Sequence, residues 1–167
     1  MIPREAILQS NLIEEIDAAD GDPLLDNHLL AARCVDLAVA VGGILHPRVL
    51  HAVLFNGLSL PLGHVPGDYR HCAVRVGNYQ LPPFDQVANH MAKWWDYRYD
   101  DPWDNHALFE AIHPFVDGNG RVGRLVYWNQ QLVGGYPLEI ISAAERGAYY
   151  DRLKEWRRLN FEKEETP

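Results

Sequence analysis

The sequence has few of the features that mark secreted or membrane-spanning proteins. It contains two cysteines in 167 residues, too few for a disulfide framework, and they do not form a Cys-x-x-Cys pair. Acidic side chains interrupt residues 1–20, where a signal peptide would need an apolar stretch, and Arg33 and Asp36 interrupt the most apolar later segment, residues 29–45. We therefore expect a soluble protein of the reducing cytoplasm with no membrane-spanning segment.

Positive charge is also scarce. Lys and Arg total 15 against 23 Asp and Glu, which gives a formal net charge of −8 at pH 7. A chain of this charge repels the phosphates of nucleic acids and of anionic membranes, so neither is expected as a partner. If the protein binds a phosphorylated ligand, its positive charge must be concentrated in a local site.

What the sequence does contain is a repeated set of helix start signals. Hydrophobic residues make up 47% of the chain, enough for the core of one compact domain over residues 1–167, and no internal repeat is present. Prolines or capping residues precede apolar residues at helical spacing. The expected helices follow Pro3, Pro23, Pro47 and Pro83, and then cover residues 103–112, residues from 122 onward and residues 142–161. The predicted fold class is all-α, a mainly helical bundle.

Residues 66–83 break this helical pattern. The β-forming residues 73–76 and 79–81 flank the pair Gly77-Asn78, which is a common hairpin turn. The pattern predicts one small β-hairpin, and by itself it leaves open whether the hairpin has a structural or a functional role.

The most informative segment is residues 113–124, His-Pro-Phe-Val-Asp-Gly-Asn-Gly-Arg-Val-Gly-Arg. The imidazole of His113 can take a proton from a hydroxyl group, and the carboxylate of Asp117 can hold Mg²⁺ through oxygen. The glycines on either side of Asn119 let backbone N–H groups approach a phosphate without a Cβ in the way. Such a combination is typical of a nucleotidyl-transfer site.

A helix is expected to begin directly after this loop, so its unpaired N–H groups would form an anion site. Arg121 and Arg124 are three residues apart, hence on one helix face, and their planar guanidinium groups suit phosphate oxygens. The alternative is an ordinary turn, in which His113 only caps the preceding helix. The number of chemical groups in so short a segment favours the phosphate site.

Residues 113–124 resemble the signature of the Fic family, His-x-Phe-x-Asp/Glu-Gly-Asn-Gly-Arg-x-x-Arg, at every specified position. The resemblance implies a Fic-type helical bundle that acts as a protein adenylyltransferase, with ATP as substrate and Mg²⁺ as cofactor. In this reaction His113 would deprotonate a Ser, Thr or Tyr hydroxyl of a target protein. AMP would be transferred to that hydroxyl, and pyrophosphate would leave.

The resemblance also implies roles for the other motif residues. Asp117 would bind the Mg²⁺ that bridges the α- and β-phosphates, and Phe115 would be buried and anchor the loop. The rest of the motif would supply an anion hole and two side chains that hold the outer phosphates. These are Gly118, Asn119 and Gly120 for the anion hole, and Arg121 and Arg124 for the phosphates.

In Fic proteins a flap beside the active site holds the target segment as an added strand. By this resemblance residues 66–83 would be the flap, which favours a functional role for the predicted hairpin. The residues expected to face the target are His71, Val74, Val76 and Tyr79.

Two further pairs of residues have competing interpretations. Tyr149 and Tyr150 resemble an aromatic pair that lines the adenine pocket in Fic proteins, but plain helix packing would explain them equally well. His106 and Glu110 have the i, i+4 spacing of a metal-binding pair. Because no third ligand follows at a suitable spacing, we expect them to be an exposed pair on a helix surface.

Residues 1–20 resemble the N-terminal inhibitory helix of one Fic subclass, whose pattern Ser/Thr-x-x-x-Glu-Gly/Asn begins here at Ser10. The resemblance implies that Glu14 pairs with Arg124, so that ATP binds in an unproductive way. The sequence departs from the pattern at Glu15, where Gly or Asn is expected. The alternative is an amphipathic helix whose two glutamates face solvent.

Other activities on the same fold stay open at this point. In some relatives the inhibitory glutamate aligns a water molecule that removes AMP, so de-AMPylation is one alternative. Doc-type relatives phosphorylate their targets and carry Lys where this chain has Gly120, which favours AMP transfer here. No residue fixes the nucleotide base, and self-modification and homo-oligomers are open as well. A non-catalytic peptide-binding module is disfavoured because such a module does not need the intact motif.

Overall fold

The computed structural model describes residues 1–96 and 101–161. These residues form seven α-helices, joined by loops and short 3₁₀ turns. The helices are α1 (Arg4–Ile13), α2 (Pro23–Ala40), α3 (Pro47–Leu54), α4 (Val87–Asp96), α5 (Pro102–Ile112), α6 (Asn119–Val133) and α7 (Arg146–Asn160). The 3₁₀ turns are η1 (Pro61–Gly63), η2 (Phe84–Gln86) and η3 (Ala143–Glu145). The predicted all-α class is confirmed.

Prolines occupy the first position of α2, α3 and α5; the sequence pattern predicts this for α2 and α3, and it places the start of the third helix at residue 103. In each case the residue before the proline caps the helix with its side chain. These caps are Asp22, His46 and Asp101, and each accepts a hydrogen bond from the backbone N–H two residues ahead. Because the first N–H groups of a helix have no acceptor within it, such caps determine where the helix begins. The predicted capping box also forms, at Ser142 and Glu145.

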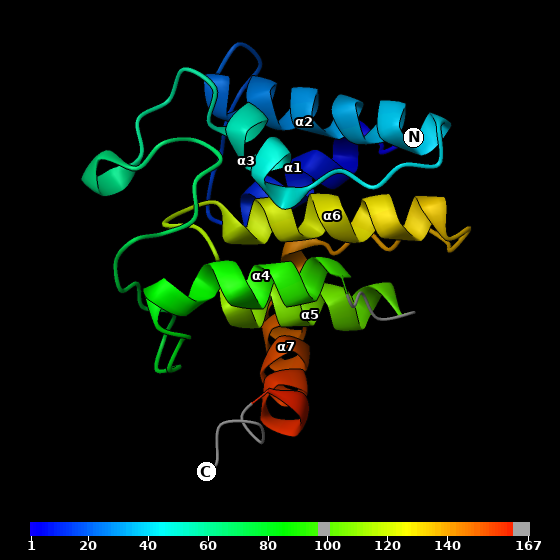
Figure 1. The fold of residues 1–167 in the computed structure, drawn as a ribbon. Coiled ribbons are helices and arrows are strands. Elements are labelled where there is room, and N and C mark those ends of the chain that lie inside the picture. The colour runs from blue at the N-terminus through cyan, green and yellow to red at the C-terminus, as the bar shows by residue number, and fades with distance from the viewer. Residues whose placement is uncertain (97–100, 162–167) are drawn as a thin grey trace.

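Helix α6 lies at the centre of the fold (Figure 1). It packs against α1, α2 and α3 on one side and against α5 on the other, and α4 packs on α5. Helix α7 runs across these layers and packs against α5. Because α6 is covered from several sides, most of its residues are buried, polar ones included. Within the described residues, no helix combines the length and the apolar character needed to cross a membrane.

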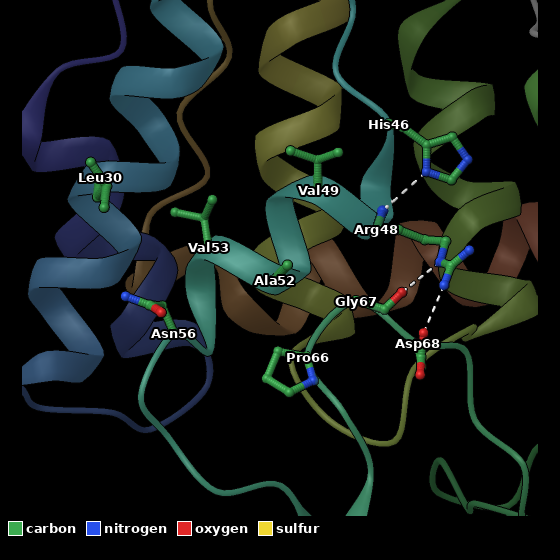
Figure 2. A pocket seen from close by; sticks show the side chains of 10 residues that line it. All are labelled: Leu30, His46, Arg48, Val49, Ala52, Val53, Asn56, Pro66, Gly67 and Asp68. Atoms are coloured by element: carbon green, nitrogen blue, oxygen red, sulfur yellow. Dashed lines mark hydrogen bonds and ion pairs between the residues drawn. The ribbon is translucent and has the colours of Figure 1, made fainter.

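A cavity of about 680 Å³ lies on the surface between α2, α3 and residues 66–68 (Figure 2). At one end Arg48 donates from Nε to the Gly67 carbonyl oxygen at 2.6 Å and from Nη2 to Asp68 Oδ1 at 2.7 Å. Arg48 therefore fixes the loop that leads into the expected hairpin. None of the motif residues 113–124 lines this cavity.

The predicted β-hairpin does not form paired strands. Val76 and Tyr79 make one isolated antiparallel bridge across the expected turn, and the described part of the chain contains no β-strand. A two-stranded hairpin is marginal in water without an apolar face to bury, and the residues on both sides of this turn are exposed or only partly buried. Residues 66–83, called the flap segment from here on, are therefore a loop with a hairpin-like tip.

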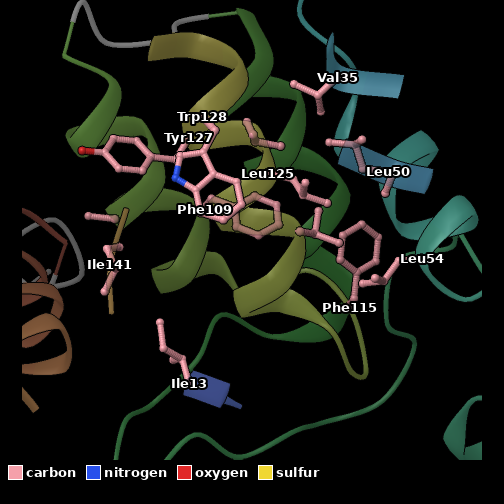
Figure 3. Close-up of a cluster of buried hydrophobic side chains, with 14 of the residues drawn as sticks. Ile13, Val35, Leu50, Leu54, Phe109, Phe115, Leu125, Tyr127, Trp128 and Ile141 are labelled. Carbon is pink, nitrogen blue, oxygen red and sulfur yellow. The ribbon is translucent and has the colours of Figure 1, made fainter. Parts of the chain in front are cut away.

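The hydrophobic core extends from α6 into the motif loop (Figure 3). Leu125 of α6, Phe109 of α5 and Leu54 of α3 belong to the same cluster as Phe115 from the loop. Phe115 is fully buried and stacks on His51 with ring centroids 4.0 Å apart. The prediction that Phe115 is buried is confirmed, and its packing fixes the loop to the core.

Candidate active site

The motif residues 113–124 form the connection between α5 and the start of α6. His113 ends α5 with a left-handed φ of 52°, and Gly118 precedes α6 with a φ of 75°. Asn119 closes the loop between them: its Oδ1 accepts a hydrogen bond from the Phe115 N–H at 2.8 Å, and its Nδ2 donates to the Phe115 carbonyl oxygen at 2.9 Å. The Asn119 side chain therefore shapes the loop, while its backbone belongs to the first turn of α6.

His113 lines a cavity of about 390 Å³ beside this loop. The wall is built from the end of α1, the flap segment, α5, α6 and α7. Its residues are Glu14, Val76, Gly77, Tyr79, Ala107, Glu110, Ala111, His113, Gly120, Arg124, Tyr149, Tyr150, Leu153, Lys154 and Arg157. The cavity therefore brings residues of the motif, the tyrosine pair and the N-terminal glutamate around one space.

The surroundings of His113 keep its imidazole neutral. Burial lowers the pKa of His113 to about 4, and the positive charge of Arg70 acts in the same direction. At neutral pH the ring is therefore unprotonated and able to accept a proton from a hydroxyl group.

The start of α6 has the geometry of an anion site. A glycine is required at position 118, because a Cβ there would lie 2.4 Å from Phe55 Cε2 in a backbone conformation that other residues rarely adopt. The N–H groups in the first turn of a helix have no acceptor within it, and the positive end of the helix dipole lies there. Gly120 brings this turn to the cavity wall.

Both motif arginines are buried, but in different surroundings. Arg124 lines the cavity, whereas Arg121 lies over the Phe55 ring, 5.2 Å from its centroid, and 3.7 Å from Asp117. Among the described residues, Nε and Nη1 of Arg121 have no hydrogen-bond partner. Because unpaired buried donors are costly, these two N–H groups mark a place where an anion would be stabilised.

Asp117 lies at the solvent edge of the loop, with its side chain 53% exposed. Its Oδ1 accepts a hydrogen bond from the Gly118 N–H at 2.5 Å. A single carboxylate in this position fits Mg²⁺, which proteins often hold through one or two carboxylates together with water and substrate phosphates. The described residues contain no cluster of three or more His, Cys, Asp or Glu side chains that could hold a metal without such phosphates.

The C-terminal end of α1 occupies part of this site. Arg124 donates from Nε to Ser10 Oγ at 2.8 Å, and from Nη2 to the Ser10 carbonyl oxygen at 2.9 Å and to Glu14 Oε1 at 2.7 Å. A Cβ on Gly120 would lie 2.2 Å from Glu14 Oε1, so the carboxylate is in contact with the first turn of α6. Glu14 therefore faces the site, although 29% of its side chain stays exposed.

Comparison with known proteins gives the family. The model of the Fic/DOC family matches residues 46–130, a span that includes the whole motif. The chain belongs to this family.

Individual relatives align with more than half of the chain. The chain is 33% identical over 158 residues to the protein adenylyltransferase Fic of Drosophila willistoni, and this alignment covers 85% of this chain and 29% of the relative. It is 35% identical over 107 residues to the protein of the same name from Aedes aegypti, which covers 56% of this chain and 21% of the relative. The chain thus spans less than a third of the length of these curated relatives.

Solved structures share the fold of this Fic domain. A Fic domain containing signaling protein from Bacteroides thetaiotaomicron superposes with a TM-score of 0.75, covers 90% of this chain and 70% of that chain, and is 17% identical. Fic-1 from C. elegans has a TM-score of 0.73, covers 91% and 54%, and is 18% identical. At sequence identities of 17% and 18%, the similarity to these structures shows a shared fold and nothing further.

Glu15 stands where the Fic inhibitory pattern has Gly or Asn, and its backbone explains that preference. Glu15 has a φ of 61°, a left-handed conformation that Gly and Asn adopt more easily than glutamate. The side chain of Glu15 pairs with Arg146 of α7 at 2.6 Å, on the protein surface. The turn after α1 therefore has a backbone conformation that suits Gly or Asn, although glutamate occupies it.

The four flap residues expected to face a target lie in two different places. Val76 and Tyr79 line the cavity, together with Gly77. Val74 does not line it, and His71 stacks on His64 with ring centroids 3.8 Å apart. Of these four residues, only Val76 and Tyr79 at the tip of the flap segment therefore reach the cavity.

The expectation that His106 and Glu110 form an exposed pair is wrong. His106 is buried, and its Nε2 is hydrogen-bonded to the Tyr149 hydroxyl at 2.9 Å. Glu110 lies on the cavity wall, where burial raises its pKa to about 8. The helical spacing correctly places both residues on one face of α5, but it does not reveal that α6 and α7 cover that face.

Sequence reasoning also missed two arginines near the motif. Arg70 is buried and donates from Nε to the His113 carbonyl oxygen at 2.9 Å. Arg157 lines the cavity and donates from Nη2 to the Ala111 carbonyl oxygen at 2.5 Å. Both bind backbone carbonyls that are distant in the sequence, so no local pattern marks them.

The close packing of α6 on α5 can be tested at Gly123. A Cβ at this position would lie 2.2 Å from Glu110 Oε1 and 3.1 Å from Phe109 Cδ1. We expect Gly123→Ala to lower the free energy of unfolding by about 1–3 kcal/mol, measured by urea denaturation. The control is Gly147→Ala on α7, where a Cβ meets nothing within 4 Å. This control should raise the free energy of unfolding by about 0.5–1 kcal/mol through helix propensity, and equal effects of the two substitutions would contradict the packing.

Proposed function

We propose that this Fic domain is a protein adenylyltransferase, which transfers AMP from ATP to a Ser, Thr or Tyr hydroxyl of a target protein. The observation that carries the proposal is the placement of a neutral His113 in one cavity with Gly120 and Arg124. A proton acceptor therefore lies beside an anion site, and transfer of AMP from ATP to a hydroxyl requires both. The name shared by the curated relatives, protein adenylyltransferase Fic, supports the proposal.

In the proposed reaction His113 takes the proton of the target hydroxyl while the hydroxyl oxygen forms a bond to the α-phosphorus. The bond from that phosphorus to the oxygen bridging the α- and β-phosphates breaks, and pyrophosphate leaves with this oxygen. The backbone N–H groups of Asn119 and Gly120 stabilise the developing negative charge, together with that of Gly118 when Asp117 Oδ1 no longer accepts from it. The proton then leaves His113 for the solvent, which restores the base.

The outer phosphates of ATP need cationic partners in an acidic protein. We assign this role to Arg121, whose Nε and Nη1 have no hydrogen-bond partner among the described residues, and to Arg124 once Glu14 no longer pairs with it. Asp117 would hold Mg²⁺, which neutralises phosphate charge when bound. Tyr149 and Tyr150 line the same cavity and offer aromatic surfaces to the nucleotide base.

We also propose that α1 inhibits the reaction. Glu14 binds the guanidinium of Arg124 and lies against Gly120. A phosphate oxygen of ATP would need to contact the same guanidinium and the same turn of α6. The ion pair is charge-assisted and mostly buried, so its geometry is well defined and competes with phosphate. ATP must therefore displace the end of α1, or bind with its outer phosphates misplaced.

The proposed partner is a protein that presents its hydroxyl in an extended segment. Val76 and Tyr79 bring the flap segment to the cavity, and apart from their single bridge this tip has no strand partner among the described residues. Such a tip can accept a further extended chain through main-chain hydrogen bonds. The same geometry would accept a segment of a second copy, which would give self-modification.

The test is to incubate the domain with Mg²⁺, a cell lysate and ATP labelled on either the α- or the γ-phosphate. AMP transfer predicts protein-bound label from α-labelled ATP alone, whereas phosphoryl transfer predicts label from γ-labelled ATP alone. Label on the domain itself would show self-modification, and parallel incubations with labelled UTP, CTP and GTP would establish the base. If a chain lacking Glu14 incorporates no label from any of these nucleotides, the proposed function is wrong.

A further inference from the structure

Arg70 connects two parts of the proposed site that are distant in the sequence. The residue is 3% exposed, and its guanidinium donates hydrogen bonds to backbone carbonyl oxygens on both parts. Nε donates to His113 at 2.9 Å, Nη1 to Cys72 at 3.3 Å and Nη2 to Pro82 at 2.7 Å. The backbone N–H of Arg70 also donates to the Pro114 carbonyl oxygen at 2.8 Å.

These acceptors are at positions that matter for the proposed reaction. Cys72 and Pro82 are the two ends of the part of the flap segment that carries Val76 and Tyr79 to the cavity. His113 has a left-handed backbone, which costs a non-glycine residue about 1–2 kcal/mol and persists only when the surroundings hold it. One side chain therefore holds both the base and the segment that would face the target.

The flap segment depends on such a support because it lacks a strand ladder. Within the described residues its only β-pairing is the bridge between Val76 and Tyr79. Pro82 and Pro83 carry no N–H group, so this end of the segment cannot donate to a neighbouring strand. The planar guanidinium has five donors in a fixed fork and can reach carbonyls in several directions, which an ammonium group cannot do in the same geometry.

We propose that Arg70 is a positioning residue for AMP transfer. It fixes the backbone of His113 and both ends of residues 72–82, so that the base and the target hydroxyl keep the relative position that the reaction needs. The proposal rests on the proposed role of His113 as the base. Arg70 does not line the cavity itself, so it acts through the groups that it holds.

The charge of Arg70 gives a second, independent observable. After burial, the positive charge of Arg70 is the largest cause that lowers the pKa of His113. Arg157 also lowers this pKa, while Asp117 and a contact with the Glu110 backbone raise it. Loss of the Arg70 charge should therefore raise the pKa of His113, and histidine NMR can measure this change without any catalysis.

The experiment compares Arg70→Met and Arg70→Lys in the full Glu14→Gly chain. Met removes the donors and the charge, whereas Lys keeps the charge but not the fork. The matched control is Arg48→Met, which removes an arginine that holds Gly67 and Asp68 of the same loop without contacting His113. The measurements are kcat for transfer, the Kd of Mg-ATP, the pKa of His113 and the rate of tryptic cleavage after Arg75.

We expect kcat to fall about 100-fold in both Arg70 variants, because a displacement of about 1 Å at the reacting groups has an effect of this size. The Kd of Mg-ATP should stay nearly unchanged, since the anion site is built from α6. Tryptic cleavage after Arg75 should become faster in both variants, and the pKa of His113 should rise in Arg70→Met but not in Arg70→Lys. Arg48→Met should leave the pKa of His113 and the Kd of Mg-ATP as in the parent chain, and its effects on kcat and on cleavage after Arg75 should be smaller than those of Arg70→Met, because Arg48 holds only the start of the flap segment.

Several results would overturn the inference. An unchanged kcat in Arg70→Met would overturn it. A kcat in Arg70→Lys equal to that of the parent chain would also overturn it, because the charge of Arg70 alone would then be sufficient. A parallel loss of Mg-ATP binding would point to general unfolding, and if Arg70→Met does not fold, Arg70→Lys decides. If the parent chain itself transfers no AMP, the proposed function fails, whereas unchanged cleavage after Arg75 and an unchanged pKa of His113 would reject the role of Arg70 separately.

Discussion

A chain carrying Glu14→Gly should transfer AMP about 10- to 100-fold faster than the unchanged chain, a range typical of coupling between a regulatory contact and a site. Glu14 binds the fully buried Arg124 at 2.7 Å, so its removal frees for an outer phosphate of ATP the N–H of Nη2 that does not donate to the Ser10 carbonyl oxygen. Ser10 still holds Nε of Arg124 and keeps the guanidinium in place. Glycine can adopt the φ of −88° at this position, the C-cap of α1, without strain.

Initial rates with α-labelled ATP would measure this effect. The matched control is Glu15→Gly, which removes the neighbouring carboxylate that pairs with Arg146 and not with Arg124. The control should leave the rate close to that of the unchanged chain. An equal increase in both variants would show a general loosening of α1, and an unchanged rate in Glu14→Gly would exclude the inhibitory role.

The same substitution should also make stability more dependent on nucleotide. Without Glu14 the buried charge of Arg124 loses its carboxylate partner, which should cost about 1–3 kcal/mol because Glu14 is itself partly exposed. A phosphate oxygen of bound ATP then supplies the missing anion. Thermal unfolding with and without Mg-ATP should therefore show a larger increase in Tm for Glu14→Gly than for the unchanged chain. A smaller increase would argue against phosphate and Glu14 sharing one position.

Much of the helical framework could be predicted from local sequence, because the signals that start helices are local. Pro23 and Pro47 correctly mark the first residues of α2 and α3, and α5 begins at Pro102, one residue before its predicted start. The hairpin prediction failed for a physical reason. β-Forming residues around Gly77-Asn78 predict a turn correctly, but strands need a partner or an apolar face, and neither follows from the order of residues alone.

The chemistry-bearing residues of the site could be identified from their spacing, but their environments could not. The motif places His113, Asp117 and the arginines on one loop and helix start, and they do lie there. Spacing alone did not reveal that α6 and α7 bury Glu110, or that Arg70 reaches the carbonyl oxygen of His113. Such contacts depend on how distant elements pack, so they appear only in the folded chain.

Replacing His113 with alanine should lower the kcat of AMP transfer by a factor of roughly 10²–10⁴, the usual contribution of a positioned base. Binding of Mg-ATP should change little, because the anion site comes from the start of α6. A second variant, His113→Asn, separates chemistry from backbone strain, since Asn adopts the left-handed conformation of this position more easily than alanine. Both variants should lose the same activity. His71→Ala is the control, because His71 stacks on His64 and does not line the cavity.

The pH dependence of the rate then identifies the group that titrates. With a pKa of about 4 in the free protein, His113 stays unprotonated through the neutral range and loses its function as a base only when acid protonates it. The value of kcat/KM, which reports the free enzyme, should therefore be flat near neutral pH and fall only as the pH approaches that pKa. Bound ATP adds negative charge beside the imidazole and raises its pKa, so kcat should begin to fall at a higher pH than kcat/KM. If instead kcat/KM fell with the ordinary pKa of a solvated histidine, the lowering of the pKa of His113 by burial would be contradicted. The residual rate of His113→Asn should lack this acidic limb, because the group that carries it is gone.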